Sequence, residues 1–448
     1  MQKQNVNGTR RAACPEGSKV PNKNWRDDVI NVADRCAKAY NFRRKLDGIK
    51  HAAIAFWEVI VFAVLFSLGT ATACRRLNKI KIADERKKNG HKKGMPRLGG
   101  TYERHERLVP DKSQVNDFKR KLPQWFVKNL EHYVLKAQLD YLLGCKMLPT
   151  NIDVIIDFND KSYYGKLKKD ESKTLIGTIK APGTNRVRKF LGVMIKAGAL
   201  RVFTHFNLIH KGVYHDEFVK QALGDLMVWG FTIRRVLADR WFANRGLLEW
   251  CQARDIEYIG PYKKQLNVVK VIHAYLKAGG DIVFSFLIQG ALARFGAQPP
   301  MQAWLFLATR DKEKLSVIRR RYLQKKLTLA EATKRIHVFV VTTQPPANKQ
   351  KRASWLRSLA QYYKHRWYIE TAFRDLDRIQ PTCHARTDGA KIFCTMMRCW
   401  HYNEWQIERE RRRRLRRVPA NVRHGPTLDE FNEIVFDASF GLSCVIAA

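Results

Sequence analysis

A short β-branched run near the middle of the chain, residues 152–158, constrains the fold more than any other feature. It reads Ile-Asp-Val-Ile-Ile-Asp-Phe, which is typical of a central strand buried on both faces. Further strand and helix patterns follow it. We expect strands at 163–168, 174–180, within 190–209, at 231–239 and at 256–260, and helices over 216–230 and 247–254. This order predicts a mixed α/β layer fold.

The flanking segments are more irregular and more basic. Residues 1–150 predict a helical, basic region, in which two helical patterns meet at a small-residue turn, as in a helix-turn-helix DNA-binding unit. Residues 261–335 predict an irregular insertion with short strands and a basic helix. Residues 336–405 predict a strand, one long helix over 353–378 and a second apolar helix. The last segment, 406–448, begins with an arginine-rich tract that is expected to be solvated or phosphate-bound.

An apolar stretch at 52–73 is long enough to span a bilayer. It carries one charge, Glu58, and ends in small and hydroxyl residues, and no second span follows it. A buried helix followed by the start of another explains the same residues. We therefore expect no membrane partner.

The charge balance indicates a polyanionic partner. Lys and Arg total 83 against 41 acidic residues, a formal net charge of +42. Such an excess repels itself in isolation, so nucleic acid is the expected partner. The nine cysteines include no CxxC pair and no zinc-finger spacing, which argues against a zinc-finger protein. Their odd number and the absence of a signal peptide predict a reducing, intracellular location.

Two aspartates stand where predicted core strands finish. Asp157 closes the first apolar strand, and Asp239 closes the strand at 231–239. Either residue alone could start a turn. Together, on strands that can lie side by side, they predict a site for hard, oxygen-loving cations such as Mg²⁺. Asp153 lies about 13 Å away along the strand and is not expected to share that site, and Asp160 is a weaker alternative to Asp157.

A third carboxylate lies in the long helix predicted over 353–378. Tyr363, Arg366, Glu370 and Asp377 have helical spacing and are expected to share one stripe of the helix. A surface ladder, with Glu370 paired to arginines one turn away, would look the same. The aromatic residues around Glu370 favour a packed helix, and a packed glutamate between arginines is a candidate for function.

Three segments of the sequence resemble those of a known protein family. Three segments, DVIIDFNDKSYYGK, VLADRWFANRGLLEWCQARDIEYIGPYKK and YYKHRWYIETAFRDL, are similar in order and content to the Asp-Asp-Glu (DDE) transposases of bacterial and archaeal insertion sequences. The last segment resembles the family's Tyr-x2-Arg-x3-Glu-x6-Lys signature. Tyr363, Arg366 and Glu370 fall in register with it, whereas Asp377 replaces the closing lysine, for which Arg374 or Arg378 could substitute. The resemblance covers residues 151–405.

The resemblance implies an RNase H-like mixed sheet flanked by helices, with a β-rich insertion and an α-helical N-terminal DNA-binding region. It implies catalytic, metal-binding roles for Asp157, Asp239 and Glu370, two Mg²⁺ ions for which Mn²⁺ can substitute, and DNA contacts by Tyr363, Arg366 and Arg374. The implied domains are 1–150 for DNA binding, 151–260 and 336–405 for the catalytic domain, 261–335 for the insertion and 406–448 for the arginine-rich C-terminal segment.

The implied function is cut-and-paste transposition. The implied partners are double-stranded DNA, at the element ends and the target, and a second copy of the chain, in the cytoplasm and nucleoid of a prokaryote. Two other functions fit the same residues. One is a nucleic-acid-binding protein with an inactive site, which would not nick DNA. The other is an RNase H-like nuclease, which would cut strands without joining them.

Overall fold

The computed structural model describes residues 73–75, 112–122, 124–164, 173–181, 183–288, 301–309, 313–379, 387–417 and 425–432. The expected helix-turn-helix unit and the apolar stretch at 52–73 lie outside these ranges, apart from Ala73 and the two residues after it. Within the ranges, no helix is both long enough and apolar enough to cross a membrane.

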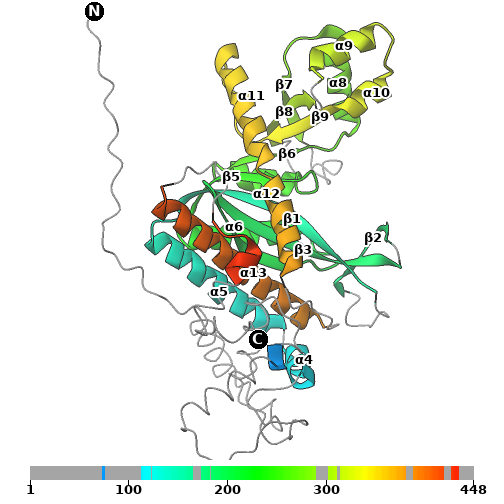
Figure 1. Ribbon diagram of the computed structural model, residues 1–448. Helices are drawn as coiled ribbons and strands as arrows, with labels where there is room; N and C mark the ends of the chain where they lie inside the picture. Colours follow the sequence, from blue (N-terminus) through cyan, green and yellow to red (C-terminus); the bar gives the residue numbers. More distant parts are fainter. Residues whose placement is uncertain are drawn as a thin grey trace, which may run out of the picture.

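Nine strands form one mixed sheet in the described part of the chain (Figure 1). Their order is β2-β3-β1-β5-β6-β9-β8-β7, and β4 pairs with β3. The strands are β1 (Asn151–Ser162), β2 (Leu175–Ala181), β3 (Thr184–Ala197), β4 (Leu200–Leu208), β5 (Thr232–Ala238), β6 (Glu257–Pro261), β7 (Val283–Ile288), β8 (Met301–Thr309) and β9 (Ile336–Val341). The predicted mixed α/β class is confirmed.

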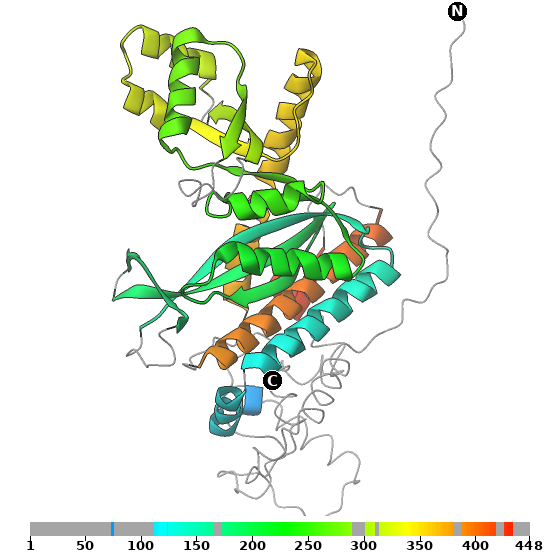
Figure 2. The ribbon, with the colours of Figure 1, turned by 180° about the vertical axis from the view of Figure 1, so that it is seen from behind.

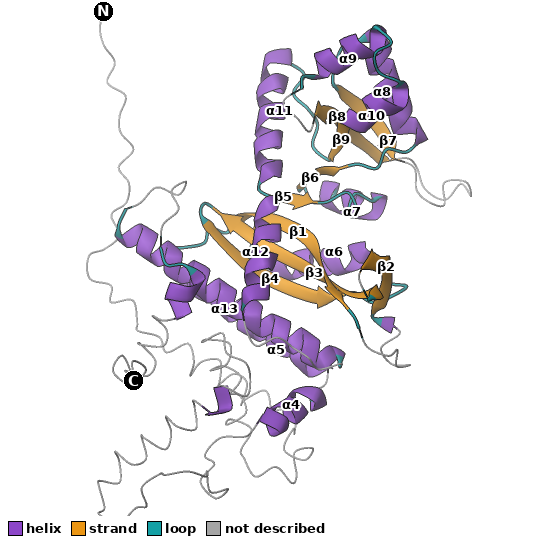
Figure 3. Cartoon of the chain, turned by 45° about the vertical axis from the view of Figure 1, so that its right-hand side comes forward, coloured by secondary structure: helices purple, strands orange, loops and turns teal. Residues whose placement is uncertain are grey.

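Helices cover both faces of this sheet (Figures 2 and 3). They are α4 (Lys112–Lys121), α5 (Gln124–Gly144), α6 (His215–Val228), α7 (Arg245–Gln252), α8 (Leu266–Ala278), α9 (Leu315–Leu323), α10 (Leu329–Arg335), α11 (Lys349–Lys364), α12 (Trp367–Arg378) and α13 (Asp388–Leu415). Helices α5 and α13 lie side by side across one face, and α12 crosses the same face. Helix α6 covers the other face.

Strand β1 separates two apolar cores. Its side chains alternate between the faces of the sheet, so Ile155 packs with α12 and α13, whereas Val154 and Ile156 pack with α6 and α7. All three side chains are fully buried. A strand buried on both faces needs apolar residues at consecutive positions, which explains why the β-branched run identified it.

Strand β1 is longer than expected. It pairs in parallel with β5 only as far as Ile156 and Ala238, but its antiparallel pairing with β3 continues to Ser162. The expectation that the strand would finish at Asp157 is therefore wrong. The additional residues are polar, and the partner strand β3 rather than their own composition keeps them extended.

The prediction of a single helix over 353–378 is also wrong, because the helix is interrupted at His365 and Arg366, between α11 and α12. The backbone N–H groups of His365 and Arg366 donate to the carbonyls of Tyr362 and Tyr363, three residues earlier, at 2.9 and 3.0 Å. Such bonds tighten one turn of a helix. The tight turn re-aims the side chains that follow it.

Helices contribute more to the insertion and to the C-terminal tract than expected. The described part of 261–335 holds α8, α9 and α10 beside β7 and β8. The arginine tract continues α13 to Leu415, and its arginines pair with their own helix: Arg411 and Arg412 with Glu408, and Arg413 and Arg414 with Glu410. These two glutamates compensate two of the seven arginine charges in residues 408–417.

Candidate active site

Asp157 and Asp239 lie next to each other on two parallel strands. Ile156 of β1 and Ala238 of β5 are the last register partners in that pairing. Asp157 and Asp239 are the residues that follow this last pair directly, so both lie at the same end of the ladder. The sheet topology therefore brings together two carboxylates that are far apart in the sequence.

The backbone orients both aspartates. One oxygen of Asp157, Oδ1, accepts a hydrogen bond from the N–H of Phe158 at 2.8 Å. Likewise, Oδ1 of Asp239 accepts one from the N–H of Arg240 at 2.7 Å. Each aspartate thus holds its own side chain in place with one oxygen and keeps the other available for a partner.

Arg366 links the first aspartate to the glutamate of α12. Its Nη1 donates to Oδ2 of Asp157 at 2.9 Å, and its Nη2 lies 2.6 Å from Oε1 of Glu370. The Arg366 and Asp157 side chains are 11% and 14% exposed, so their ion pair is largely shielded from water, whereas Glu370 is 33% exposed. Arg366 belongs to the tight turn between α11 and α12, which aims its guanidinium at β1.

Close packing sets the position of α12. Gly192 of β3 is the register partner of Asp157, and a Cβ at this glycine would lie 2.7 Å from the ring of Phe373. Phe373 and Ile369, both on α12, belong to the same apolar core as Ile155 of β1. The missing side chain at position 192 therefore lets the helix carrying Glu370 approach the sheet beside Asp157.

The electrostatics indicate a surplus of negative charge at this point. Burial raises the pKa of Asp157 to about 6, against the lowering effects of Arg366 and the Phe158 N–H. The negative charges of Asp239 and Glu370 raise this pKa further. Asp239 and Glu370 therefore both act on Asp157, and Arg366 lies between Asp157 and Glu370.

The arrangement fits a divalent cation chemically. In the described ranges, no group of three or more His, Cys, Asp or Glu residues is already set closely enough to hold a metal ion. Asp157, Asp239 and Glu370 nevertheless supply only hard oxygen donors. Burial and like charge disfavour the ionised form of Asp157, and a bound cation would relieve both effects. We regard these three residues as the ligand set to test.

Two other predicted residues lie at different distances from this cluster. The ring of Tyr363 packs edge-on against Phe339, with centroids 4.8 Å apart, and its centroid is 5.8 Å from the guanidinium carbon of Arg366. Arg374 is exposed on α12 and donates to the hydroxyl of Thr371 at 3.3 Å. Tyr363 therefore borders the cluster, whereas Arg374 lies on the solvent side of the helix.

The neighbouring aspartates have other partners. Asp153 accepts two hydrogen bonds from Arg234, at 3.0 and 2.9 Å. Asp160 pairs with Lys189, with Nζ to Oδ1 at 2.6 Å. These pairings agree with the preference for Asp157 over both.

Asp377, which replaces the signature lysine, pairs with Lys161 of β1. Nothing in the sequence around Lys161 singles it out. Its place beside α12 depends on the extension of β1, and no local sequence signal shows that extension. A lysine is therefore present beside this position of α12, although it comes from a strand rather than from the helix.

The comparisons identify the class of protein. Residues 179–403 match the family described as the transposase DDE domain. The match spans half of the chain, so the chain belongs to the DDE transposase-domain family. Asp239 and Glu370 lie inside the matched residues, and Asp157 lies before them.

Two further comparisons were made. No curated protein matches the chain. Among solved structures, the cryo-EM structure of the piggyBac transposase synaptic complex with hairpin DNA is similar at 11% sequence identity, with a TM-score of 0.45, covering 94% of this chain and 80% of that chain. The family assignment rests on the domain match.

Proposed function

We propose that the protein is a DNA transposase that binds the ends of its own insertion sequence and catalyses metal-dependent strand cleavage and strand transfer. The observation that carries this proposal is the placement of Asp157 and Asp239 directly after the last register pair of the β1–β5 ladder, with Glu370 joined to Asp157 through Arg366. The family match supports phosphoryl transfer as the class of reaction.

The strand order supports an RNase H-like catalytic domain. Strands β1, β3 and β4 are antiparallel neighbours, and β5 and β6 continue the sheet parallel to β1. Family resemblance implies one carboxylate on the first strand, one after the fourth and one on a helix against the sheet. Asp239 follows β5 here, because the short strand β2 precedes β3.

Asp157, Asp239 and Glu370 would hold two Mg²⁺ ions, which Mn²⁺ can replace and which would stabilise charge on the attacking and leaving oxygens of one phosphodiester. In the cleavage step, water attacks the phosphorus and the 3′-oxygen leaves. In the transfer step, that 3′-hydroxyl would attack a phosphodiester of the target, forming a new P–O bond while the target's own 3′-oxygen leaves as a hydroxyl. One site can serve both steps, because attack is in line and the charge develops on the same oxygens.

Arg366 and Tyr363 would position the phosphate. Arg366 already lies between two carboxylates, and a guanidinium binds a phosphate with the same two-pronged geometry. Joining two element ends to one target also calls for two copies of the chain, so we propose a homodimer on double-stranded DNA. The expected place of action is the prokaryotic cytoplasm, on nucleoid DNA.

The test is Mg²⁺-dependent nicking of a plasmid that carries the DNA flanking this protein's own coding sequence. Asp157→Asn, Asp239→Asn and Glu370→Gln should each lower cleavage by at least about a thousandfold, since each removes a ligand charge needed in the transition state. Binding of the same DNA should change little. Asp160→Asn is the matched control, because this carboxylate lies on the same strand but pairs with Lys189.

The outcome also separates the competing functions. Wild-type cleavage without any joined product would favour the nuclease, and DNA binding without cleavage in Mg²⁺ or Mn²⁺ would favour the inactive binding protein. Full cleavage by any one of the three variants would remove that residue from the site.

A further inference from the structure

A cavity of about 430 Å³ opens near the start of β1, at the opposite end of the strand from Ser162. Residues from β1, β3, β5, α11 and α13 line it. Its volume is within the range of roughly 300–1,000 Å³ typical of ligand sites. Arg234, one of the lining residues, has a side chain that is 52% exposed, so solvent reaches the cavity. We call this cavity the basic pocket.

The charges of its lining are unbalanced. The basic lining residues are Lys196, Arg234, Arg413 and Arg414, and the acidic ones are Asp153 and Glu410. Both acidic residues already have partners: Arg234 holds Asp153, and Arg413 and Arg414 hold Glu410 at 2.7 Å. The lining therefore keeps an excess of two positive charges.

Lys196 is the cation without a counter-ion. It faces Asp153 across the β1–β3 ladder, yet no carboxylate in the described ranges lies within ion-pairing distance of its ammonium group. Burial lowers the pKa of Lys196, and the positive charges of Arg201 and Arg234 lower it further, against the opposing effect of Asp153. Such an environment favours the arrival of an anion.

A second group in the wall lacks a partner. The Nδ1 atom of His365 is buried and has no hydrogen-bond partner among the described residues. His365 also lines the pocket, and its ring stacks on Tyr368 with centroids 5.4 Å apart. Because Nδ1 is closed off inside the wall, a ligand in the pocket would be contacted by the other edge of the imidazole.

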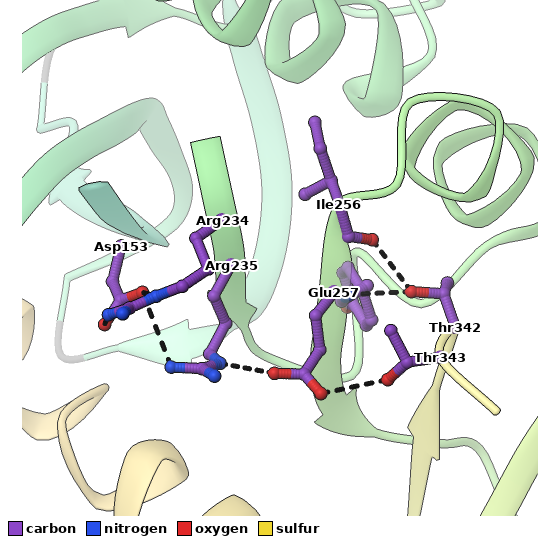
Figure 4. Close-up of polar contacts among 8 residues, drawn as sticks. Asp153, Arg234, Arg235, Ile256, Glu257, Thr342 and Thr343 are labelled. Atoms are coloured by element: carbon purple, nitrogen blue, oxygen red, sulfur yellow. Dashed lines mark hydrogen bonds and ion pairs between the residues drawn. The ribbon is translucent and has the colours of Figure 1, made fainter. Parts of the chain in front are cut away.

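A chain of polar contacts builds the wall behind these groups. Figure 4 shows the chain of contacts that builds it: Asp153 with Arg234 and Arg235, Arg235 with Glu257, and Glu257 with Thr343. The Arg235 guanidinium also stacks 3.6 Å above the ring of Tyr362. Arg235 and Glu257 pair with each other within the wall, so Glu257 does not pair with Lys196 or Arg234.

The basic pocket lies on the same face of the sheet as the proposed active site. Asp153 and Asp157 are four residues apart on β1, or roughly 13 Å, with side chains on one face. The tight turn between α11 and α12 joins both places, since His365 lines the pocket and the next residue, Arg366, contacts Asp157. Phosphates of one DNA strand recur about every 3.4 Å along the helix axis, so 13 Å spans about four base pairs.

We propose that the basic pocket is a second phosphate site, at which Lys196, Arg234 and His365 hold a backbone phosphate of the DNA strand whose scissile phosphate lies at Asp157 and Asp239. This inference rests on the proposed function. The pocket fixes the register of the strand, and so sets how far from the held phosphate the cut falls.

The experiment measures binding of the full-length protein to the DNA flanking its coding sequence, at salt concentrations from 50 to 200 mM. Lys196→Met should weaken binding about tenfold at 50 mM and lower the slope of log K against log salt by about one. Lys196→Arg, which keeps the charge, should restore both. Lys136→Met is the matched control, because that lysine pairs with Asp140 on the surface of α5.

Equal salt slopes for Lys196→Met and Lys136→Met would overturn the proposal, as would a Lys196→Met chain that unfolds more easily than Lys196→Arg and shows no change in slope.

A second experiment adds inorganic triphosphate. If it stabilises the wild type but not Lys196→Met while DNA binding is unchanged, the pocket takes a free oligophosphate and the DNA assignment is wrong. If Lys196→Met shows the lowered salt slope but the wild-type protein never cleaves DNA, the proposed catalytic function is wrong and the phosphate site stands.

Discussion

Asp157 is a buried carboxylate surrounded by two other carboxylates and one arginine. Its pKa of about 6 is above its ordinary value of 3.8, mainly because burial disfavours the charged form. Because the pKa is higher in the folded protein than in the unfolded chain, ionisation of Asp157 opposes folding. The protein should therefore be less stable above pH 6 than below pH 4, by on the order of 2–3 kcal/mol from this residue.

Asp157→Asn removes this pH dependence. The variant and the wild type should have the same free energy of unfolding near pH 4, where the wild-type carboxyl is neutral. At pH 8 the free energy of unfolding of the variant should be the higher of the two. Urea unfolding at both pH values measures the difference, with Asp160→Asn as the control for an amide on this strand. Millimolar Mg²⁺ at pH 8 should raise the melting temperature of the wild type and leave that of Asp157→Asn unchanged.

A constant difference between the variant and the wild type across this pH range would contradict the account. It would mean that Arg366 compensates the charge of Asp157 fully, and that no cation is needed at this point.

At the scale of elements, the approach of α12 to β3 depends on Gly192. Gly192→Ala would place a methyl group 2.7 Å from the ring of Phe373, so the helix must move outward. We expect a loss of about 1–3 kcal/mol in unfolding free energy. We also expect slower strand cleavage in the protein that remains folded, because Glu370 moves with the helix. Gly177→Ala on β2 is the control, since nothing lies within 4 Å of its added Cβ.

The double variant Gly192→Ala, Phe373→Leu separates the two effects. If the smaller side chain at 373 restores cleavage, the helix position is what matters. If Gly192→Ala cleaves DNA at the wild-type rate, the close packing does not set the position of Glu370.

Helix α13 holds β4 through one buried amide. Asn403 accepts a hydrogen bond from the N–H of Phe203 at 2.7 Å and donates to its carbonyl at 2.8 Å. Asn403→Ala would leave both backbone groups buried without partners, at a cost of about 2–4 kcal/mol in urea unfolding. Thr395→Ala should cost under about 1 kcal/mol, because that hydroxyl bonds only to its own helix. Similar losses of unfolding free energy for both variants would show that the Asn403 side chain does not hold β4 against α13.

Local sequence predicted some elements and not others, for physical reasons. The run at 152–158 identified β1 because a doubly buried strand must be apolar at successive positions. Helix α8 was missed because its Val-Val-Lys-Val-Ile sequence also suits a strand, and tertiary packing of Val268 and Ile272 decides for the helix. No proline or glycine marks the turn at His365 and Arg366, so no local signal indicates it.

The candidate site shows the same division. Strand positions were enough to predict that Asp157 and Asp239 would be neighbours, because parallel strands align their carboxyl ends. Glu370 needed the family resemblance, since its helical spacing fits a surface ladder equally well. The bridge from Arg366 to Asp157 spans 209 residues of sequence, and spacing within the helix could not reveal it.

At the scale of the whole molecule, the net charge of +42 predicts the strength of salt dependence. Binding to DNA of unrelated sequence should weaken by about 10³ to 10⁵ between 50 and 200 mM salt, if six to ten phosphates are contacted. Fluorescence anisotropy with a labelled duplex measures this. An affinity that does not change over that range would show that the charge serves a partner other than nucleic acid.

Strand β6 is short and lies between β5 and β9 in the sheet. Its partner β9 follows the insertion in sequence, and the two strands pair at Ile259–Val341 and at two further register pairs. A shortened enzyme that omitted β7, β8 and β9 would leave one side of β6 as an open edge with unpaired N–H and C=O groups. Open edges recruit strands from other molecules, so the truncated chain would aggregate, and any reduction in size has to retain β9.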